Sequence, residues 1–268
     1  MFGKKNQTTT PEQDFPYWLV AAGGLAVFLL FQIATDEIYS QVMATVSRGI
    51  GLTVFVTLTG FFLASVLGLL LALASLSGSI FLRQTARFYV EIVRGLPILV
   101  LLLYIAFVAT PLIIAGINAV LEPLGLNTLR TRDFPLLWRA IAALTIGYSA
   151  FIAEVFRAGI QAVDTGQIEA AKALGMTGWQ RFRLIVFPQA LKTILPPLGN
   201  DFVAMIKDSS LVSVLGVADI TQLGKIYAAG SFRYFETYNV VALIYLMMTI
   251  TLSLALRKFE RTRDVGGR

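Results

Sequence analysis

The chain has 268 residues, of which 56% are hydrophobic, and its mean hydropathy is +0.73. It is more apolar than an ordinary soluble domain, in which about half of the residues or fewer are apolar. It contains no cysteine and no histidine, which excludes disulfides, thiol catalysis, histidine metal sites and histidine general bases. The formal net charge of +6 would suit nucleic acid or an anionic membrane. The distribution of charge along the chain favours membrane topology as its cause, without a nucleic-acid partner.

Apolar runs close to the roughly 20 residues that a membrane-spanning helix needs recur along the chain. The first run follows Lys4 and Lys5, as in a signal peptide, but no small-x-small cleavage site follows it. We therefore expect a cytoplasmic tail over 1–16, a transmembrane domain over 17–258 and a second cytoplasmic tail over 259–268. About six spans are predicted, at residues 17–35, 51–77, 95–119, 136–158, 197–217 and 238–256.

Lysine and arginine residues are unevenly divided between the two sides that these spans define. Six spans place both termini on one side, and most of the 22 lysines and arginines lie on that side. The positive-inside rule then predicts that the tails and the 164–196 loop are cytoplasmic. The least consistent part of this assignment is the group Arg130, Arg132 and Arg139, which fall together in one expected outer loop.

The segment at 164–196 is polar and basic, although it lies between two apolar runs. It predicts two short helices. Gly175 is a candidate for the left-handed residue that ends the first helix, because glycine adopts that conformation at little cost. Thr177 is a candidate N-cap for the second helix, with Gln180 three residues later completing a capping box.

The second of these short helices is expected to be amphipathic. Trp179, Phe182 and Val186 would share one stripe, and the helix would end before Pro188, whose ring disfavours continuation. A folded, amphipathic and basic element between two spans indicates a docking surface for a soluble partner.

The same segment resembles the EAA loop of the membrane subunits of bacterial ABC importers. The resemblance lies in Glu169-Ala170-Ala171, Gly175, Ile185 and the Phe187-Pro188 pair. It implies that this loop forms a coupling helix, which sits in a groove on a separate ATP-hydrolysing subunit. The expected coupling residues are Glu169, Ala170, Ala171, Gly175, Trp179, Phe187 and Pro188.

Polar residues interrupt the fourth and fifth predicted spans, at Glu154 and at Asn200, Lys207 and Asp208. An ionisable group near the bilayer centre costs about 2.5–3.5 kcal/mol on insertion scales, so each needs a compensating partner or a wet cavity. One interpretation is structural: Glu154 pairs with Arg157, and Lys207 pairs with a carboxylate, so that the helices can pack.

The other interpretation is that these groups line a path for a charged or zwitterionic solute. A solute ammonium would contact Glu154 or Asp208, and a solute carboxylate would contact Lys207 or Arg94. Both interpretations can hold in different states of a gated transporter. The candidate substrate residues are therefore Glu154, Lys207, Asp208, Asn200 and Arg94.

Residues 89–97, 148–159 and 200–211 resemble segments shared by polar amino acid permeases, the histidine/glutamine-type branch of the ABC importers. The resemblance covers about residues 45–258. It implies an all-α type I importer fold in the bacterial cytoplasmic membrane, with a second permease subunit, two ATPase subunits and an external solute-binding protein. The first predicted span is extra to the five-span core of that branch.

The sequence has no Gly-x-x-x-x-Gly-Lys-Ser/Thr phosphate loop and no metalloenzyme or nucleophile motif. We therefore expect a permease subunit that is not itself an enzyme and holds no cofactor, while its partner ATPases bind ATP and magnesium. The expected substrate is an amino acid, polar or charged. The alternatives are a secondary transporter that uses Glu154 or Asp208 as a proton or sodium site, and a membrane enzyme.

Overall fold

The computed structural model describes residues 17–265, except for the side chains of residues 18, 19 and 260–265. The expected tail at residues 1–16 and the last three residues lie outside this range. Between residues 17 and 265 all regular structure is helical, which confirms the predicted all-α class. The α-helices are α1 (Tyr17–Thr35), α2 (Glu37–Val46), α3 (Ile50–Ser75), α4 (Ile80–Arg94), α5 (Ile98–Tyr104), α6 (Thr110–Leu121), α7 (Leu136–Gln161), α8 (Thr165–Ala173), α9 (Gly178–Arg181), α10 (Phe187–Asp208), α11 (Ile220–Ser231) and α12 (Tyr234–Val265).

Shorter helical segments connect several of these helices. Turns of 3-10 helix cover Ser47–Gly49, Glu122–Leu124, Thr131–Asp133 and Ser209–Leu215, and π-helical turns cover Ile105–Ala109 and Phe182–Val186. The chain therefore runs as nearly continuous helix from α2 into α3, from α5 into α6 and from α9 into α10. Long rods of this kind satisfy backbone groups internally, as lipid requires.

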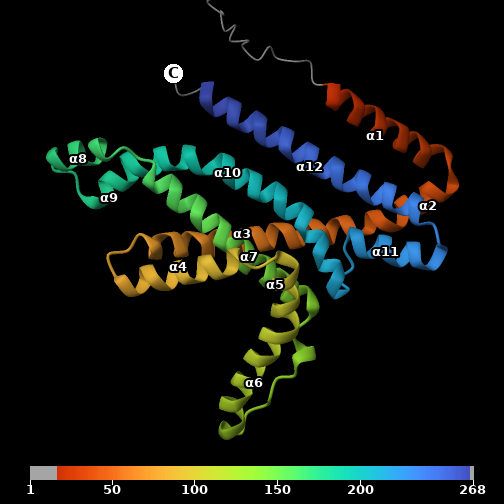
Figure 1. Cartoon of the computed structure of the whole chain (residues 1–268), viewed down its shortest axis with the longest axis horizontal. Helices are drawn as coiled ribbons and strands as arrows, with labels where there is room; N and C mark the ends of the chain where they lie inside the picture. The colour runs from red at the N-terminus through yellow and green to blue at the C-terminus, as the bar shows by residue number, and fades with distance from the viewer. Residues whose placement is uncertain (1–16, 266–268) are drawn as a thin grey trace, which may run out of the picture.

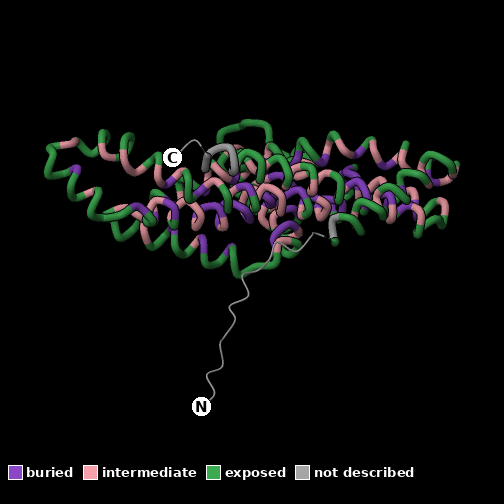
Figure 2. Tube along the Cα trace, turned by 90° about the horizontal axis from the view of Figure 1, so that it is seen from above, coloured by how far each residue is buried: buried purple, intermediate pink, exposed green. Residues whose placement is uncertain are grey.

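The centre of the molecule is the packing of α3 against α7, with α10 crossing α7 on another side (Figure 1). Small residues permit the close approach of α3 to α7. A Cβ atom added at Gly68 would lie 2.9 Å from Ile152 Cγ2, and Ala64 is buried against Tyr148 and Met205. Buried stretches gather along the middle of the bundle, as Figure 2 shows.

A second layer is formed by α1, α2, α11 and α12. Val42, Val46, Ile220 and Val240 are fully or almost fully buried where these helices meet. The additional N-terminal helix α1 packs on α2 and α12, and its outer face is apolar and exposed, with Phe31 63% accessible. That face is suited to contact with lipid.

Four helical stretches within the described residues are long and apolar enough to cross a membrane, namely Glu37–Ser75, Ile98–Leu124, Leu136–Gln161 and Tyr234–Phe259. The predicted count of six spans is therefore not confirmed. Helices α1 and α10 are not among these four stretches, and α10 carries several polar residues. The last span, Tyr234–Phe259, begins earlier and ends later than the expected 238–256, and α12 continues as helix to Val265.

The prediction that a helix ends before Pro188 is wrong. The chain continues from α9 through a π turn into α10, with Pro188 in the first turn of that helix. The Phe187 amide bonds to the Phe182 carbonyl, five residues earlier. The wider turn accommodates a residue that lacks an amide hydrogen and would clash with an ordinary helical turn.

The same extra residue changes which side chains share a face. Phe182 lies against Trp179, with ring centroids 5.8 Å apart, and against Phe187, at 5.9 Å. Val186 packs instead with the inner cluster around Val163 and the start of α10. The predicted Trp179–Phe182–Val186 stripe is thus corrected to one that ends on Phe187, because a π turn rotates the following residues by one position.

A second π turn precedes Pro111 and explains one arginine of the outer loop. The Thr110 amide bonds to the Ile105 carbonyl, and Pro111 has no amide hydrogen, so the buried Ala106 carbonyl has no helical partner. Arg139 supplies one: its Nη1 donates to the Ala106 oxygen at 3.1 Å. The same buried guanidinium donates to the carbonyls of Phe134 and Thr131, so it holds the 131–134 turn against α5 and α6.

Candidate docking segment and polar sites

The first half of the docking segment is a short helix with defined ends. Asp164 caps α8 by accepting a hydrogen bond from the Gly166 amide at 2.6 Å. At the other end Gly175 has φ +74°, its amide bonds to the Lys172 carbonyl, and the Met176 amide bonds to the Ala171 carbonyl. This is a Schellman arrangement, and it confirms Gly175 as the left-handed residue that ends the first helix.

The second half begins with the predicted capping box. The Thr177 amide donates to Gln180 Oε1 at 2.8 Å, and the Gln180 amide donates to Thr177 Oγ1 at 3.3 Å. Arg181 Nη1 donates to the Met176 carbonyl at 3.1 Å, which closes the corner between α8 and α9. The corner is therefore a folded unit held by its own local hydrogen bonds.

The outer face of this corner is exposed and partly apolar. Leu174 is 82% accessible and Trp179 is 67% accessible, whereas Ala171 is buried at 2%. Glu169 and Ala170 lie on the exposed side of α8. Figure 1 shows α8 and α9 projecting together at one end of the molecule. Large apolar side chains held out on a rigid corner are typical of a protein-binding surface.

The corner is fixed to the membrane helices from its inner side. Val163, Ala190 and Ile194 form a buried cluster between the end of α7 and the start of α10. In addition, Gln189 Nε2 on α10 donates to Gln167 Oε1 on α8 at 2.6 Å. The corner is thereby attached to α7 and α10 by packed contacts and a hydrogen bond.

The five candidate substrate residues do not form one site in this chain. Glu154, on α7, is paired with Arg157: Arg157 Nε lies 3.0 Å from Glu154 Oε1, and Nη2 also contacts the carboxylate. Arg94, at the end of α4, places its guanidinium 5.6 Å from the centre of the Phe151 ring. The Glu154 carboxylate and the Arg94 guanidinium are within electrostatic range of each other.

Asp208 lies on a different side of α7. It accepts a hydrogen bond from the Tyr148 hydroxyl at 2.7 Å. Asp201, two turns earlier on α10, has a buried Oδ2 with no hydrogen-bond partner among the described residues. Lys207 and Asn200 lie on the exposed face of α10, and within residues 17–265 Lys207 makes no ion pair. Of the two ion pairs considered, only Glu154–Arg157 is formed within the described chain.

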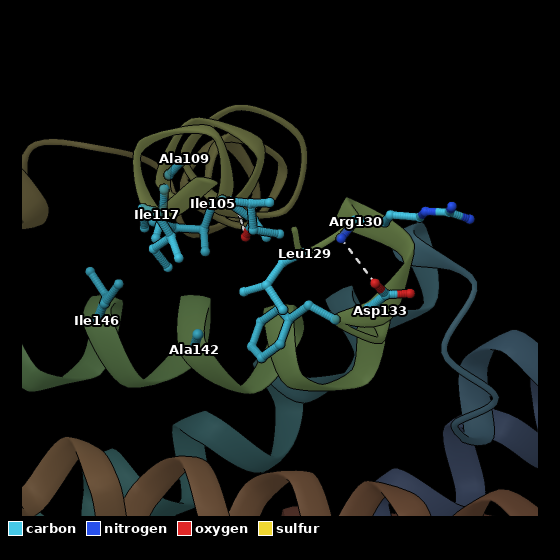
Figure 3. A pocket seen from close by; sticks show the side chains of 12 residues that line it. Ile105, Ala109, Ile117, Leu129, Arg130, Asp133, Ala142 and Ile146 are labelled. Atoms are coloured by element: carbon cyan, nitrogen blue, oxygen red, sulfur yellow. Dashed lines mark hydrogen bonds between the residues drawn. The ribbon is translucent and has the colours of Figure 1, made fainter. Parts of the chain in front are cut away.

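Two cavities, of which only the first is lined by a candidate substrate residue, differ in chemistry. One, of about 300 Å³, has a mainly polar lining from α3, α4 and α7, including Arg87, Glu91 and Glu154. The other, of about 410 Å³, lies between α5–α6 and α7, and its lining is almost wholly apolar (Figure 3). There Leu129 and Ile117 face the cavity from opposite sides, and the Arg130 amide donates to Asp133 Oδ2 at its rim. The apolar cavity suits a lipid chain or a neighbouring helix, not an amino acid.

One buried polar cluster was not found from the sequence. Asp219, before α11, is fully buried, accepts from the Gln222 amide at 2.8 Å and accepts from the Tyr245 hydroxyl at 3.1 Å. Burial raises the pKa of this carboxyl, while its hydrogen bonds oppose the shift. The N-cap pattern Asp219-x-x-Gln222 was visible in the sequence, but the contact with α12 depends on the fold.

These features define a class: a polytopic helical membrane protein with an exposed, partly apolar corner between α7 and α10. Residues 64–263 match the family described as "Binding-protein-dependent transport system inner membrane component". The chain belongs to this family, and it is therefore an inner membrane transport component, a permease subunit of the ABC importer type.

Known proteins similar to the chain agree with this assignment. It is 34% identical over 225 residues to the probable amino-acid permease protein YxeN of Bacillus subtilis, covering 84% of this chain and 94% of that protein. It is 35% identical over 218 residues to the glutamine transport system permease protein GlnP of Escherichia coli K12, covering 81% and 92%.

Solved structures of importers share the fold. A crystal structure of an amino acid ABC transporter with histidines is 38% identical, with a TM-score of 0.70, and the match covers 86% of this chain and 98% of that one. An inward-facing structure of the MetNI methionine ABC transporter, at 24% identity, has a TM-score of 0.63 over 82% and 96%. The predicted type I ABC importer permease fold is confirmed.

Proposed function

We propose that this chain forms the membrane path through which an ATP-driven importer takes up an amino acid, polar or charged. The proposal is supported by the relatives, since YxeN is described as an amino-acid permease and GlnP as part of a glutamine transport system. The candidate residues Glu154, Asp208 and Lys207 carry charges of both signs, as a path for a solute with an ammonium and a carboxylate would require.

The α8–α9 corner is the observation that carries the mechanism. Its exposed Leu174 and Trp179, its backbone-defined shape and its packed attachment to α7 and α10 fit a docking surface for an ATPase subunit. We assign ATP and magnesium to that partner. The coupling residues in this proposal are Glu169, Ala170, Ala171, Gly175, Trp179, Phe187 and Pro188.

The proposed assembly contains two permease subunits, this chain with a relative or a second copy, two ATPase subunits and an external solute-binding protein. Both termini and the α8–α9 corner lie in the cytoplasm. ATP binding closes the ATPases, and the paired corners pass this movement to α7 and α10. Moving a gate from 1:99 to 99:1 requires about 5.5 kcal/mol of differential stabilisation, which nucleotide binding by a partner can supply.

The test is reconstitution of the chain with its ATPase subunits and binding protein in sealed liposomes. We expect uptake of labelled amino acids that requires enclosed ATP and the binding protein and that persists when ionophores collapse the ion gradients. Uptake that follows a proton or sodium gradient without ATP would instead identify a secondary transporter. A variant tests the docking surface directly: Trp179→Ala should weaken co-purification with the ATPase while leaving membrane insertion intact.

A further inference from the structure

The polar cavity between α3, α4 and α7 opens beside the docking corner. Its lining includes Gln161, the last residue of α7, which lies three positions before the Asp164 cap of α8. Arg157 connects the cavity to that end of α7, because its Nη1 donates to Gln161 Oε1 at 2.8 Å. Whatever occupies the cavity therefore contacts the helix turn that leads into the docking corner.

Two charges of opposite sign in the cavity are unpaired. Arg87 and Glu91 are one turn apart on α4, where an arginine and a glutamate commonly pair, yet neither makes a hydrogen bond or ion pair with another described residue. By contrast, Glu154 is neutralised by Arg157 in the same cavity. The lining thus offers at neighbouring positions a guanidinium and a carboxylate that make no hydrogen bond, with the Arg87 guanidinium within electrostatic range of Glu154.

We propose that this cavity binds a free amino acid from the cytoplasmic side, with its carboxylate on Arg87 and its ammonium on Glu91. Arg87 matches a carboxylate because a guanidinium donates two parallel hydrogen bonds, and Glu91 accepts from an ammonium. A ligand whose two charged groups are on one carbon reaches both side chains at once. A volume of about 300 Å³ is ample for such a ligand.

The expected consequence is feedback by the transported product. An amino acid held between α4 and α7 resists the relative movement of these helices, so it biases the docking corner toward one state of the transport cycle. Rising internal amino acid would then slow ATP-driven uptake. This inference rests on the proposed function, since it identifies the ligand with the product of transport.

The experiment uses the complex of this chain with its ATPase subunits, in nanodiscs without the binding protein. Each of the twenty standard L-amino acids is added, and thermal stability and basal ATP hydrolysis are measured. We expect at least one amino acid to stabilise the complex and lower hydrolysis, and we expect its apparent affinity to fall roughly ten-fold or more in Arg87→Gln and in Glu91→Gln. Arg132→Gln, an exposed arginine outside the cavity, is the matched control and should behave as wild type.

Three results would overturn the proposal: no amino acid has an effect, both variants respond like wild type, or the response follows phosphatidylethanolamine in the nanodisc and no amino acid. Uptake by the Arg87→Gln variant is measured in ATP-loaded liposomes, with and without enclosed amino acid. This measurement separates the feedback proposal from the proposed function. If the proposed function holds and the feedback site does not, uptake and its inhibition by internal amino acid both stay at wild-type levels. If neither holds, ATP-dependent uptake is absent in wild type as well.

Discussion

Arg139 shows how one residue can look misplaced in the sequence and be required by the fold. In the sequence it is a positive charge on the outer side, against the usual charge bias. In the structure it is 6% exposed, and it donates to three backbone carbonyls from two separate segments. Its charge is dispersed over three peptide dipoles, of which the buried Ala106 carbonyl would otherwise have no helical partner.

Arg139→Gln should therefore destabilise the protein. A glutamine is too short to reach all three carbonyls, and the buried Ala106 carbonyl, if left unpaired, costs about 1–3 kcal/mol. For a chain of this size the apparent unfolding midpoint should fall by roughly 2–4 °C for each kcal/mol. Thermal unfolding in detergent measures this, and Arg132→Gln, on the exposed part of the same turn, should leave the midpoint unchanged.

Asp219 gives a prediction about pH. Because burial raises its pKa in the folded chain, the protonated form is favoured by folding. Its contribution to stability is complete below about 3.9, the ordinary pKa of an aspartate, and is lost as the pH rises through the higher folded-state pKa. Asp219→Asn keeps an oxygen for the α11 cap but does not titrate.

The unfolding midpoints of wild type and Asp219→Asn should be compared at stepwise pH through this range. We expect wild type to lose stability relative to the variant as the pH rises. Parallel pH profiles of the two proteins would contradict a raised pKa at this position.

At the scale of elements, the docking corner depends on backbone shape at Gly175. Its φ of +74° is unfavourable for a side chain, above all a β-branched one, although a Cβ atom there would meet nothing within 4 Å. Gly175→Val should therefore distort the α8–α9 turn without an internal clash. Gly175→Asn should be tolerated, because asparagine adopts the left-handed region more easily.

The expected outcome is loss of ATP-dependent uptake in Gly175→Val, with membrane insertion retained, and near-normal uptake in Gly175→Asn. Wild-type uptake in the valine variant would argue against a coupling role for this turn. Loss in both variants would show that the partner needs a bare glycine surface here, independent of the turn conformation.

At the scale of the whole molecule, Gly49 joins the N-terminal and C-terminal halves, because it packs directly against the backbone at the start of α11. A Cβ atom there would lie 2.4 Å from the Ile220 amide nitrogen and 2.5 Å from the Asp219 carbonyl carbon. Backbone atoms cannot rotate away, so α11 would have to shift from the α2–α3 junction. Overpacking of this kind costs about 1–3 kcal/mol or more.

Gly49→Ala should therefore lower the unfolding midpoint by several degrees, as measured in detergent by loss of the monodisperse protein peak after heating. Gly51→Ala is the matched control, because a Cβ atom at that position meets nothing within 4 Å. Equal midpoints for the two variants would show that the junction is looser than this packing implies.

The sequence by itself determined the class of protein and much of the docking corner. Composition predicts a membrane bundle because a helix that spans the bilayer needs a long run of apolar residues, which can be seen in the sequence. The Gly175 turn and the Thr177 capping box were predictable because such motifs lie within six consecutive residues. The predicted helix end before Pro188 was wrong. The cost of a proline in a helix can be judged from the local sequence, whereas the π turn that accommodates Pro188 depends on packing on both sides of the helix.

Only the tertiary structure decided how the polar residues are grouped. Tyr148 and Asp208 are 60 positions apart, and Arg139 and the Ala106 carbonyl are 33 apart, so no local pattern relates them. The fold separates Glu154 and Arg94 from Asp208, leaves Lys207 exposed, and brings Arg87 and Glu91 to one cavity with Arg157. Hydropathy and helical period place a side chain on a face of its helix, but which faces meet is set by packing between helices distant in sequence.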